Sequence, residues 1–189
     1  MVNYLSLLTL AFLVSLTSCR KFEQEKVIAE AEPYTPKNLY PIERLPTYFN
    51  RVALMPCFYP DSASSILDFA DDAFYRELSQ ARLFEVVQIT PEVCKELFGQ
   101  PRFSSSHPLP SDFMEVLIAH TQANGVAFID LHSYKAYKPL SLGVRCKLID
   151  LKSGDFMWAI DETIDAGDAS VIVAANHFQR SKHVNALSA

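Results

Sequence analysis

The chain has 189 residues and a formal net charge of −5, from 17 Lys and Arg against 22 Asp and Glu. This acidic balance argues against non-specific binding to nucleic acid, which needs an excess of basic residues. A content of 49% hydrophobic and 21% charged residues excludes global disorder, and the length fits one domain with an appended segment. The charge is unevenly distributed, because residues 1–18 contain no charged side chain.

This charge-free start predicts an export signal. Its apolar stretch, Tyr4 to Leu16, holds about 13 residues. As a helix it measures roughly 20 Å, short of the roughly 30 Å hydrocarbon core of a bilayer, so a signal peptide is favoured over a permanent span. Lys or Arg normally precedes such a stretch, whereas here Arg20 and Lys21 follow it. Two alternatives stay open: an uncleaved anchor with a cytoplasmic C-terminal part, and a wrongly assigned start codon.

Four residues at the end of the apolar stretch resemble the lipobox of bacterial lipoproteins. They are Leu16, Thr17 and Ser18, followed by Cys19. The resemblance implies cleavage before Cys19, a thioether-linked diacylglycerol on its thiol and an acyl chain on its new amino group. No other cofactor is expected. We therefore expect a lipoprotein of the cell envelope, held in the outer membrane by this lipid anchor, with its domain facing the periplasm.

The next segment, residues 19–48, predicts a tether. It is mixed in charge and carries Pro33, Pro36, Pro41 and Pro46, which keep its second half extended. A flexible chain of this length reaches about 30 Å, enough to hold a domain clear of lipid headgroups. The expected organisation is a signal peptide at 1–18, the lipidated cysteine and tether at 19–48 and an α/β domain at 49–189.

Hydrophobic periodicity and capping residues predict the elements of this domain. In chain order they are a strand at 51–56, a helix from Asp61 or Ser62 to about Gln80, a strand at 83–89, a helix from Thr90 to Gly99, a loop at 100–110, a helix from Ser111 or Asp112 to Asn124–Gly125, strands at 126–138, 141–151 and 156–160, and a last helix that Asp168 caps. The order β-α-β-α-α-β-β-β-α predicts an α/β (α+β) fold, with a mixed sheet of about five strands in a three-layer or two-layer domain.

Two of these helices carry further expectations. The helix that begins near Asp112 has Glu115 three residues later, the spacing of a capping box, and should bury Phe113, Val116, Leu117 and His120. The last helix should present an apolar side formed by Val171, Ala174, Ala175 and Phe178.

The succession of these segments resembles the α/β domain of the TolB N-terminal region and of the curli-secretion channel lipoproteins. The resemblance rests on a strand that ends in proline (RVALMP), a second strand (LFEVV), a helix end followed by a strand (ANGVAFI), and a hairpin (LIDLKSGDFMW). The residues that match the signature of this fold are Pro56, Gly125, Asp150, Gly154 and Trp158. Trp158 is also expected to pack simply in the core.

The resemblance implies an envelope protein that works through protein contacts, without a catalytic centre. Residues 99–111, the longest connection, are too short and too polar for the long membrane hairpins of curli-type channels. We therefore expect a non-catalytic accessory or assembly lipoprotein that binds other envelope proteins or itself, and no nucleic acid. The alternatives are a subunit of an envelope transport or secretion system, and a small ligand-binding or enzymatic domain.

The chemistry-bearing residues give weak signals. If Cys19 is lipidated, three cysteines remain, Cys57, Cys94 and Cys146, and their spacing is not that of metal ligands. We expect them to be small core residues. One disulfide with one remaining thiol is the alternative. Asp130 and His132 share one face of a strand, which suits an acid-base or metal site, but no third ligand is spaced to match. We expect no metal and no catalytic residue.

Two other groups of residues are open to a second interpretation. Asp68, Asp71 and Asp72 form an acidic cluster that is expected to be a solvated helix face. Four aromatic residues are equally compatible with a contact patch for a partner and with packing in the core; they are Phe58, Tyr59, Tyr134 and Tyr137.

Overall fold

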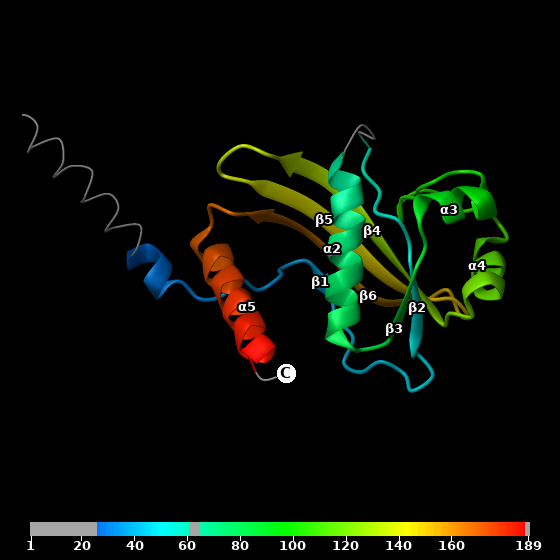
Figure 1. The fold of residues 1–189 in the computed structure, drawn as a ribbon, viewed down its shortest axis with the longest axis horizontal. Helices are drawn as coiled ribbons and strands as arrows, with labels where there is room; N and C mark the ends of the chain where they lie inside the picture. Colours follow the sequence, from blue (N-terminus) through cyan, green and yellow to red (C-terminus); the bar gives the residue numbers. More distant parts are fainter. Residues whose placement is uncertain (1–25, 61–64, 188–189) are drawn as a thin grey trace, which may run out of the picture. The chain divides into compact units, whose positions relative to one another are not determined.

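Short apolar runs between turn signals become the strands of a six-stranded mixed sheet (Figure 1). The computed structural model describes residues 26–60 and 65–187, so the expected lipobox, Cys19 and the helix start at Asp61 or Ser62 lie outside the described residues. The elements are β1 Leu39–Tyr40, β2 Arg51–Leu54, α2 Ser65–Ala81, β3 Glu85–Gln88, α3 Pro91–Phe98, α4 Phe113–Thr121, β4 Gly125–Lys135, β5 Ser141–Asp150, β6 Phe156–Asp165 and α5 Ala169–Leu187.

The chain divides into two compact units. Of the described residues, the sheet unit comprises 36–60, 65–136 and 141–164, and the helical unit comprises 26–35, 137–140 and 165–187. None of the described helices is long and apolar enough to cross a membrane.

The strand order of the sheet is β1-β6-β5-β4-β2-β3. β2 pairs in parallel with both β3 and β4, whereas β4 and β5, like β1 and β6, are antiparallel. The parallel pairs need crossovers, which α2 and then α3 with α4 provide. The predicted mixed sheet with helices against it is confirmed. The sixth strand, β1, comes from the end of the segment expected to be a tether, where Leu39 and Tyr40 pair with Ile160 and Ala159 of β6.

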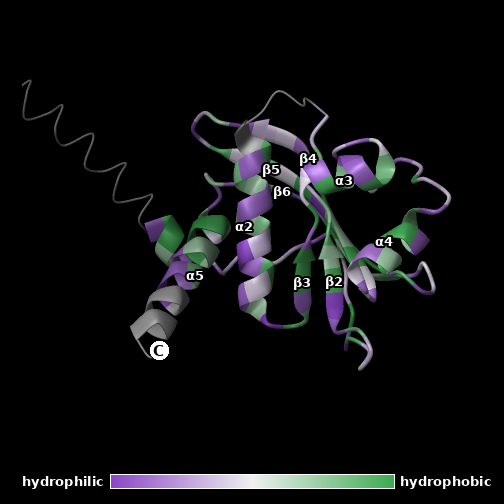
Figure 2. Cartoon of the chain, turned by 45° about the vertical axis from the view of Figure 1, so that its right-hand side comes forward, coloured by the Kyte–Doolittle hydropathy of each residue, from purple (hydrophilic) through white to green (hydrophobic). Residues whose placement is uncertain are grey.

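Helices cover both faces of the sheet around β2 and β4. On the first face, Val52, Leu54, Ala127 and Ile129 join a core with Leu67 and other residues of α2. The second face contributes Ala53, Val126 and Phe128 to a core with α3 and α4. Because β2 is buried on both faces, its sequence is continuously apolar after Arg51 (Figure 2).

α3 forms where its capping residues predict it. The Thr90 hydroxyl accepts a hydrogen bond from the Val93 N–H at 3.3 Å, and Pro91 occupies the first turn. Gly99 ends the helix in the left-handed conformation, at φ 80°, and donates its N–H to the Lys95 carbonyl. The prediction for this helix is confirmed at both ends.

The prediction for α4 is confirmed at its start, where Asp112 directly precedes the first helical residue, Phe113, but it is wrong about the capping side chain and about the end of the helix. Asp112 makes no capping hydrogen bond from its side chain, and the helix ends at Thr121, with Gln122 in the left-handed conformation. The Asn124 N–H donates instead to the Arg51 carbonyl at 2.8 Å, which ties this residue to the sheet. His120 is exposed rather than buried.

α5 begins as expected but does not bury the expected side. The Asp168 carboxylate accepts the Ser170 N–H at 2.9 Å, which confirms the predicted cap. Val171 and Ala174 are half-buried, whereas Ala175 and Phe178 are exposed. The predicted apolar side is therefore wrong for its last two members.

The surroundings of Gly125 and Pro56 in the sheet favour these two residues for steric and hydrogen-bonding reasons. A Cβ atom on Gly125 would run into the Phe49 ring, which packs over the start of β4. Pro56 is buried just beyond β2, and the flanking N–H groups of Met55 and Phe58 donate to carbonyls of β4. Pro56 itself has no N–H to satisfy, so burying it leaves no donor unpaired.

The turn between β5 and β6 is built around Asp150. The carboxylate, only 1% exposed, accepts the N–H groups of Lys152 and Ser153 and the Tyr48 hydroxyl, at 2.7, 3.2 and 2.5 Å. Gly154 takes φ 78°, a conformation that favours glycine, and donates its N–H to the Asp150 carbonyl. The aspartate and glycine of the predicted hairpin signature thus shape one tight turn.

We expect Asp150→Asn to lower the free energy of unfolding by about 1–2 kcal/mol at neutral pH, because a buried carboxylate loses charge-assisted hydrogen bonds. Burial raises the pKa of Asp150, but the hydrogen bonds from Tyr48, Lys152 and Ser153 outweigh it and hold the pKa below its usual range. The charged form therefore stabilises the fold above the unfolded pKa of about 3.9 and loses this effect as the pH falls through the folded pKa.

Urea denaturation of the parent and of Asp150→Asn between about pH 7 and pH 3 measures this effect. The difference between their free energies of unfolding should become smaller at the acidic end. Asp155→Asn, on an exposed residue of the same turn, is the control. A difference between Asp150→Asn and the parent that stays constant over this range would contradict the assignment.

Candidate functional site

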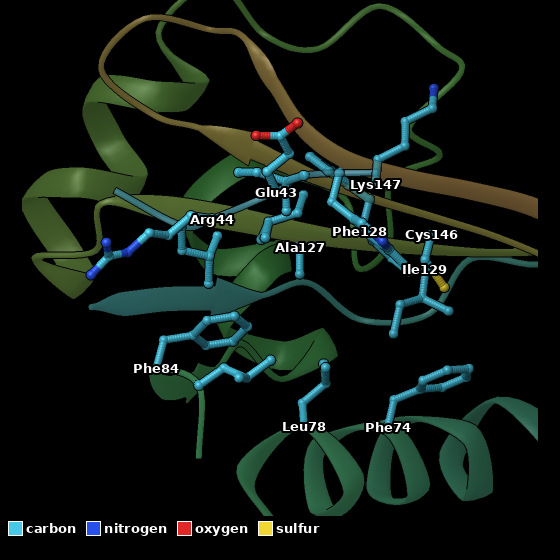
Figure 3. Close-up of a pocket in the computed structure, with 15 residues that line it drawn as sticks. Glu43, Arg44, Phe74, Leu78, Phe84, Ala127, Phe128, Ile129, Cys146 and Lys147 are labelled. Carbon is cyan, nitrogen blue, oxygen red and sulfur yellow. The ribbon is translucent and has the colours of Figure 1, made fainter. Parts of the chain in front are cut away.

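An apolar groove of about 680 Å³ opens on the first face of the sheet (Figure 3). One wall is α2, which contributes Phe74 and Leu78, one helical turn apart. The floor is made of alternate residues of the central strands, because only every second side chain of a strand points to this face. The full lining is Ile42, Glu43, Arg44, Leu45, Phe74, Leu78, Leu83, Phe84, Ala127, Phe128, Ile129, Cys146, Lys147, Leu148 and Trp158.

Two bordering residues turn their side chains away from the groove. Phe128 belongs to the core of the second face. Lys147 donates from Nζ to the Ser105 carbonyl at 2.9 Å, and its ammonium lies 5.6 Å from the centre of the Phe156 ring. The Lys147 charge is therefore engaged elsewhere, and the floor is formed by apolar side chains.

Charge is confined to one part of the rim. Glu43 and Arg44 are exposed, and neither makes a hydrogen bond or ion pair within the described ranges. In Figure 3 the Arg44 guanidinium lies on the same side of the groove as Phe84, the Glu43 carboxylate points in another direction, and Cys146 lies at the opposite side. The groove thus has a cationic end and an apolar end.

The cysteines act as small apolar residues. Burial raises the pKa of the Cys146 thiol to about 12, with a contribution from the Asp130 carboxylate, so it stays protonated in the groove at neutral pH. Burial also raises the pKa of Cys94 to about 11 and that of Cys57 well above its ordinary range. All three are free thiols, and the prediction of small core residues is confirmed for the buried Cys57 and Cys94.

Trp158 is half-buried and lines the groove from β6. It packs against the core of the first face, as expected, but it also borders open space. Since it is the only tryptophan of the chain, its fluorescence reports on this groove alone.

Asp130 anchors the loop that follows α3. Its carboxylate is 3% exposed and accepts the hydroxyl groups of Ser104 and Ser105 at 3.1 and 2.7 Å, together with the Ser105 N–H. Every one of these donors comes from the same loop. The carboxylate therefore fastens residues 104–105 to the sheet, and it has no free space for a substrate.

His132 has a different set of partners. It lies where the register between β4 and β5 shifts, and its Nε2 is 3.2 Å from an Asp161 oxygen. Arg145 donates to the same Asp161 carboxylate at 2.7 Å and to the Ser106 hydroxyl at 2.7 Å. No group of three metal-ligating side chains occurs in the described part of the chain. The structure therefore does not join Asp130 and His132 in one catalytic or metal site.

Arg102 forms a polar clamp that the sequence does not reveal. Its guanidinium donates to the Cys57 carbonyl at 2.6 Å and lies 2.9 Å from the Asp71 carboxylate, which in turn accepts the Cys57 N–H at 2.6 Å. The side chain of Asp71 is only 11% exposed, whereas that of Asp68 is 87% exposed and Asp72 is exposed as well. The expected solvated acidic face is therefore correct for Asp68 and Asp72 and wrong for Asp71.

The four candidate aromatic residues differ in burial and in the unit to which they belong, so the structure does not place them in one exposed patch. Phe58 is half-buried, pairs through its backbone with β4, and packs edge-to-face against His107. Tyr59 is half-buried in the core of the first face. Tyr134 and Tyr137 are 46% and 81% exposed and belong to different units.

The fold is shared with a known lipoprotein. The crystal structure of lipoprotein GNA1162 from Neisseria meningitidis matches with a TM-score of 0.50 at 17% identity, over 70% of this chain and 99% of that one. The PelC dodecamer from Paraburkholderia phytofirmans (TM-score 0.47, 14% identity, 72% and 89% of the two chains) and the LpoB C-terminal domain from Escherichia coli (0.43, 12%, 61% and 82%) also match. Neither a protein family nor a curated protein sequence matches the chain. The predicted α/β domain is thus confirmed at the level of the fold.

Proposed function

We propose that this protein is a lipoprotein of the cell envelope, anchored through acyl chains on Cys19, and that its sheet unit acts without catalysis through contacts with other envelope proteins. The observation that carries the proposal is the Leu16-Thr17-Ser18-Cys19 motif, which ends a charge-free apolar stretch ahead of an α/β unit. The shared fold with a lipoprotein from Neisseria meningitidis supports it.

The chain between anchor and sheet sets the working range of this unit. About 20 residues separate Cys19 from Leu39, where the chain joins the sheet. Even fully extended, a segment of this length spans at most about 70 Å, which bounds the distance between the anchor and the sheet unit. In our proposal the sheet unit works next to the membrane, on the periplasmic side of the outer membrane.

Exposed apolar side chains of the sheet unit are candidates for protein contacts. Phe69 is 71% exposed on the outer side of α2, and Leu83 and Phe156 are 66% and 53% exposed. Aromatic and large aliphatic side chains supply most of the binding energy when a partner covers them. This mode of action needs no catalytic group.

Cys19→Ser tests the anchor. We expect complete loss of labelling by a clickable fatty acid and release of the protein from the membrane fraction, because serine cannot form the thioether that holds diacylglycerol. Cys146→Ala is the control and should keep both label and membrane association. Labelling that persists in Cys19→Ser would refute acylation at this residue.

Purification of the acylated protein in mild detergent, after crosslinking in cells, tests the partner class. A soluble or outer-membrane envelope protein, or a second copy of this chain, is expected in the crosslinked product. Consistent co-purification of a membrane permease would favour the alternative, in which the protein is a subunit of an envelope transport system.

A further inference from the structure

We propose that the groove on the first face binds the hydrocarbon chain of a single-chain amphiphile, with its anionic head at Arg44 and its tail directed toward Cys146. This inference goes beyond the proposed function and does not depend on acylation of Cys19. The chemistry it names is one acyl chain with a carboxylate or phosphate head.

The size and shape of the groove suit such a ligand. Ligand sites typically enclose about 300–1,000 Å³ and are lined mostly by apolar side chains with a few polar groups in fixed places. The groove has about 680 Å³ and runs between α2 and the floor of the sheet, from Arg44 and Phe84 at one end to Cys146 at the other (Figure 3). An elongated ligand with one polar end matches this layout.

The polarity of the lining favours a hydrocarbon over a peptide. The floor and the helical wall present aliphatic and aromatic groups, including Ala127, Ile129 and Leu78, together with a thiol that stays protonated. A peptide segment laid here would bring N–H and C=O groups that need hydrogen-bond partners, at a cost of about 1–3 kcal/mol for each unpaired group. A methylene chain carries no such groups and gains from leaving water.

The charge at the rim selects the head. Arg44 carries a guanidinium that is exposed at one end of the groove and has no partner in the described part of the chain. Glu43 is also exposed, but its carboxylate points in another direction. Guanidinium groups pair well with carboxylate and phosphate oxygens, so an anionic head is favoured at this end over a cationic one.

Trp158 provides the assay. The full chain is placed in phosphatidylcholine nanodiscs free of detergent and titrated with a fatty acid brominated in mid-chain, which quenches nearby tryptophan. We expect saturable quenching in the parent protein. Leu78→Glu should weaken this binding at least tenfold, because a carboxylate on the groove wall must be desolvated when the chain enters.

Phe69→Glu is the matched control, since it also introduces a glutamate into α2 but at an exposed residue outside the groove. It should bind like the parent, and melting curves of both variants show whether they are folded. Quenching that is not saturable, or that is equal in folded Leu78→Glu and in the parent, would overturn the proposal. Dimerisation at assay concentration that hides Trp158 and excludes the ligand would overturn it too, since a second copy would then fill the groove.

Arg44→Glu tests the orientation. It should weaken binding of the brominated fatty acid about fivefold, as expected for an exposed ion pair of up to about 1 kcal/mol, and leave the neutral methyl ester unaffected. Lys95→Glu, on the exposed side of α3, should change neither. Brominated lysophosphatidate in place of the fatty acid distinguishes a phosphate head from a carboxylate head. Equal loss for the acid and the ester would refute the placement of the head at Arg44.

Discussion

Phe113→Ala should lower the free energy of unfolding by about 4 kcal/mol, which is the largest single effect that we expect in this protein. Phe113 is 1% exposed and packs against three other rings. The ring centres of Phe98, Phe103 and Phe128 lie 4.7, 5.6 and 5.8 Å from its own. These rings come from α3, the following loop and β4, so truncation leaves a cavity where three segments meet and that none of them can fill by a local shift.

Urea denaturation followed by circular dichroism measures this loss. Phe69→Ala is the control, because it removes the same ring from a site that is 71% exposed, and it should change stability by less than about 0.5 kcal/mol. Phe113→Leu, which keeps most of the volume, should fall between the two. If Phe113→Ala costs no more than Phe69→Ala, the aromatic cluster does not support the second core.

Elements with complete local signals were predictable. α3 has a hydroxyl cap at Thr90, Pro91 in its first turn and Gly99 at its end, and each acts within four residues along the chain. The turn from Asp150 to Gly154 is equally local. In both elements the residues that form the sequence pattern are the same ones that make the stabilising hydrogen bonds, so the pattern is sufficient to predict the structure.

The end of α4 and the strand β1 were not predicted, because pairing within the sheet decides both. Asn124-Gly125 reads as a helix end, but Asn124 bonds to β2 and Gly125 starts β4, so α4 ends earlier. β1 has only two residues and no pattern of its own. It exists because the edge of β6 offers unpaired backbone groups to Leu39 and Tyr40.

The candidate site was predictable only in its parts. Alternation along β5 predicts one apolar face, and the periodicity of α2 predicts another. Whether the two faces close on each other or leave a groove depends on how the bulk of Phe74, Leu78 and Trp158 fills the space between them, which no local pattern specifies. The partners of Arg102 are likewise hidden, because they lie 45 and 31 residues away along the chain.

Arg102→Ala should lower the free energy of unfolding by about 3 kcal/mol. Arg102 is 15% exposed and its guanidinium holds together the loop after α3, the Cys57 carbonyl beyond β2 and the Asp71 carboxylate of α2. Its removal leaves a largely buried carboxylate without a counter-charge and a carbonyl without its donor. Arg102→Lys should recover only part of the loss, since an ammonium cannot reproduce the fork of N–H donors that serves both acceptors.

Urea denaturation of a set of variants separates this clamp from a general loss of packing. Arg76→Ala is the control, because its ion pair with Glu77 is exposed and should be worth less than about 1 kcal/mol. Adding Asp71→Leu to Arg102→Met removes the unpaired charge, so the double variant should be less destabilised than the sum of the single changes. It should not return to the parent value, because the Cys57 N–H still loses its acceptor. Strictly additive effects would show that Arg102 and Asp71 stabilise the fold independently, and the clamp would then not exist as a unit.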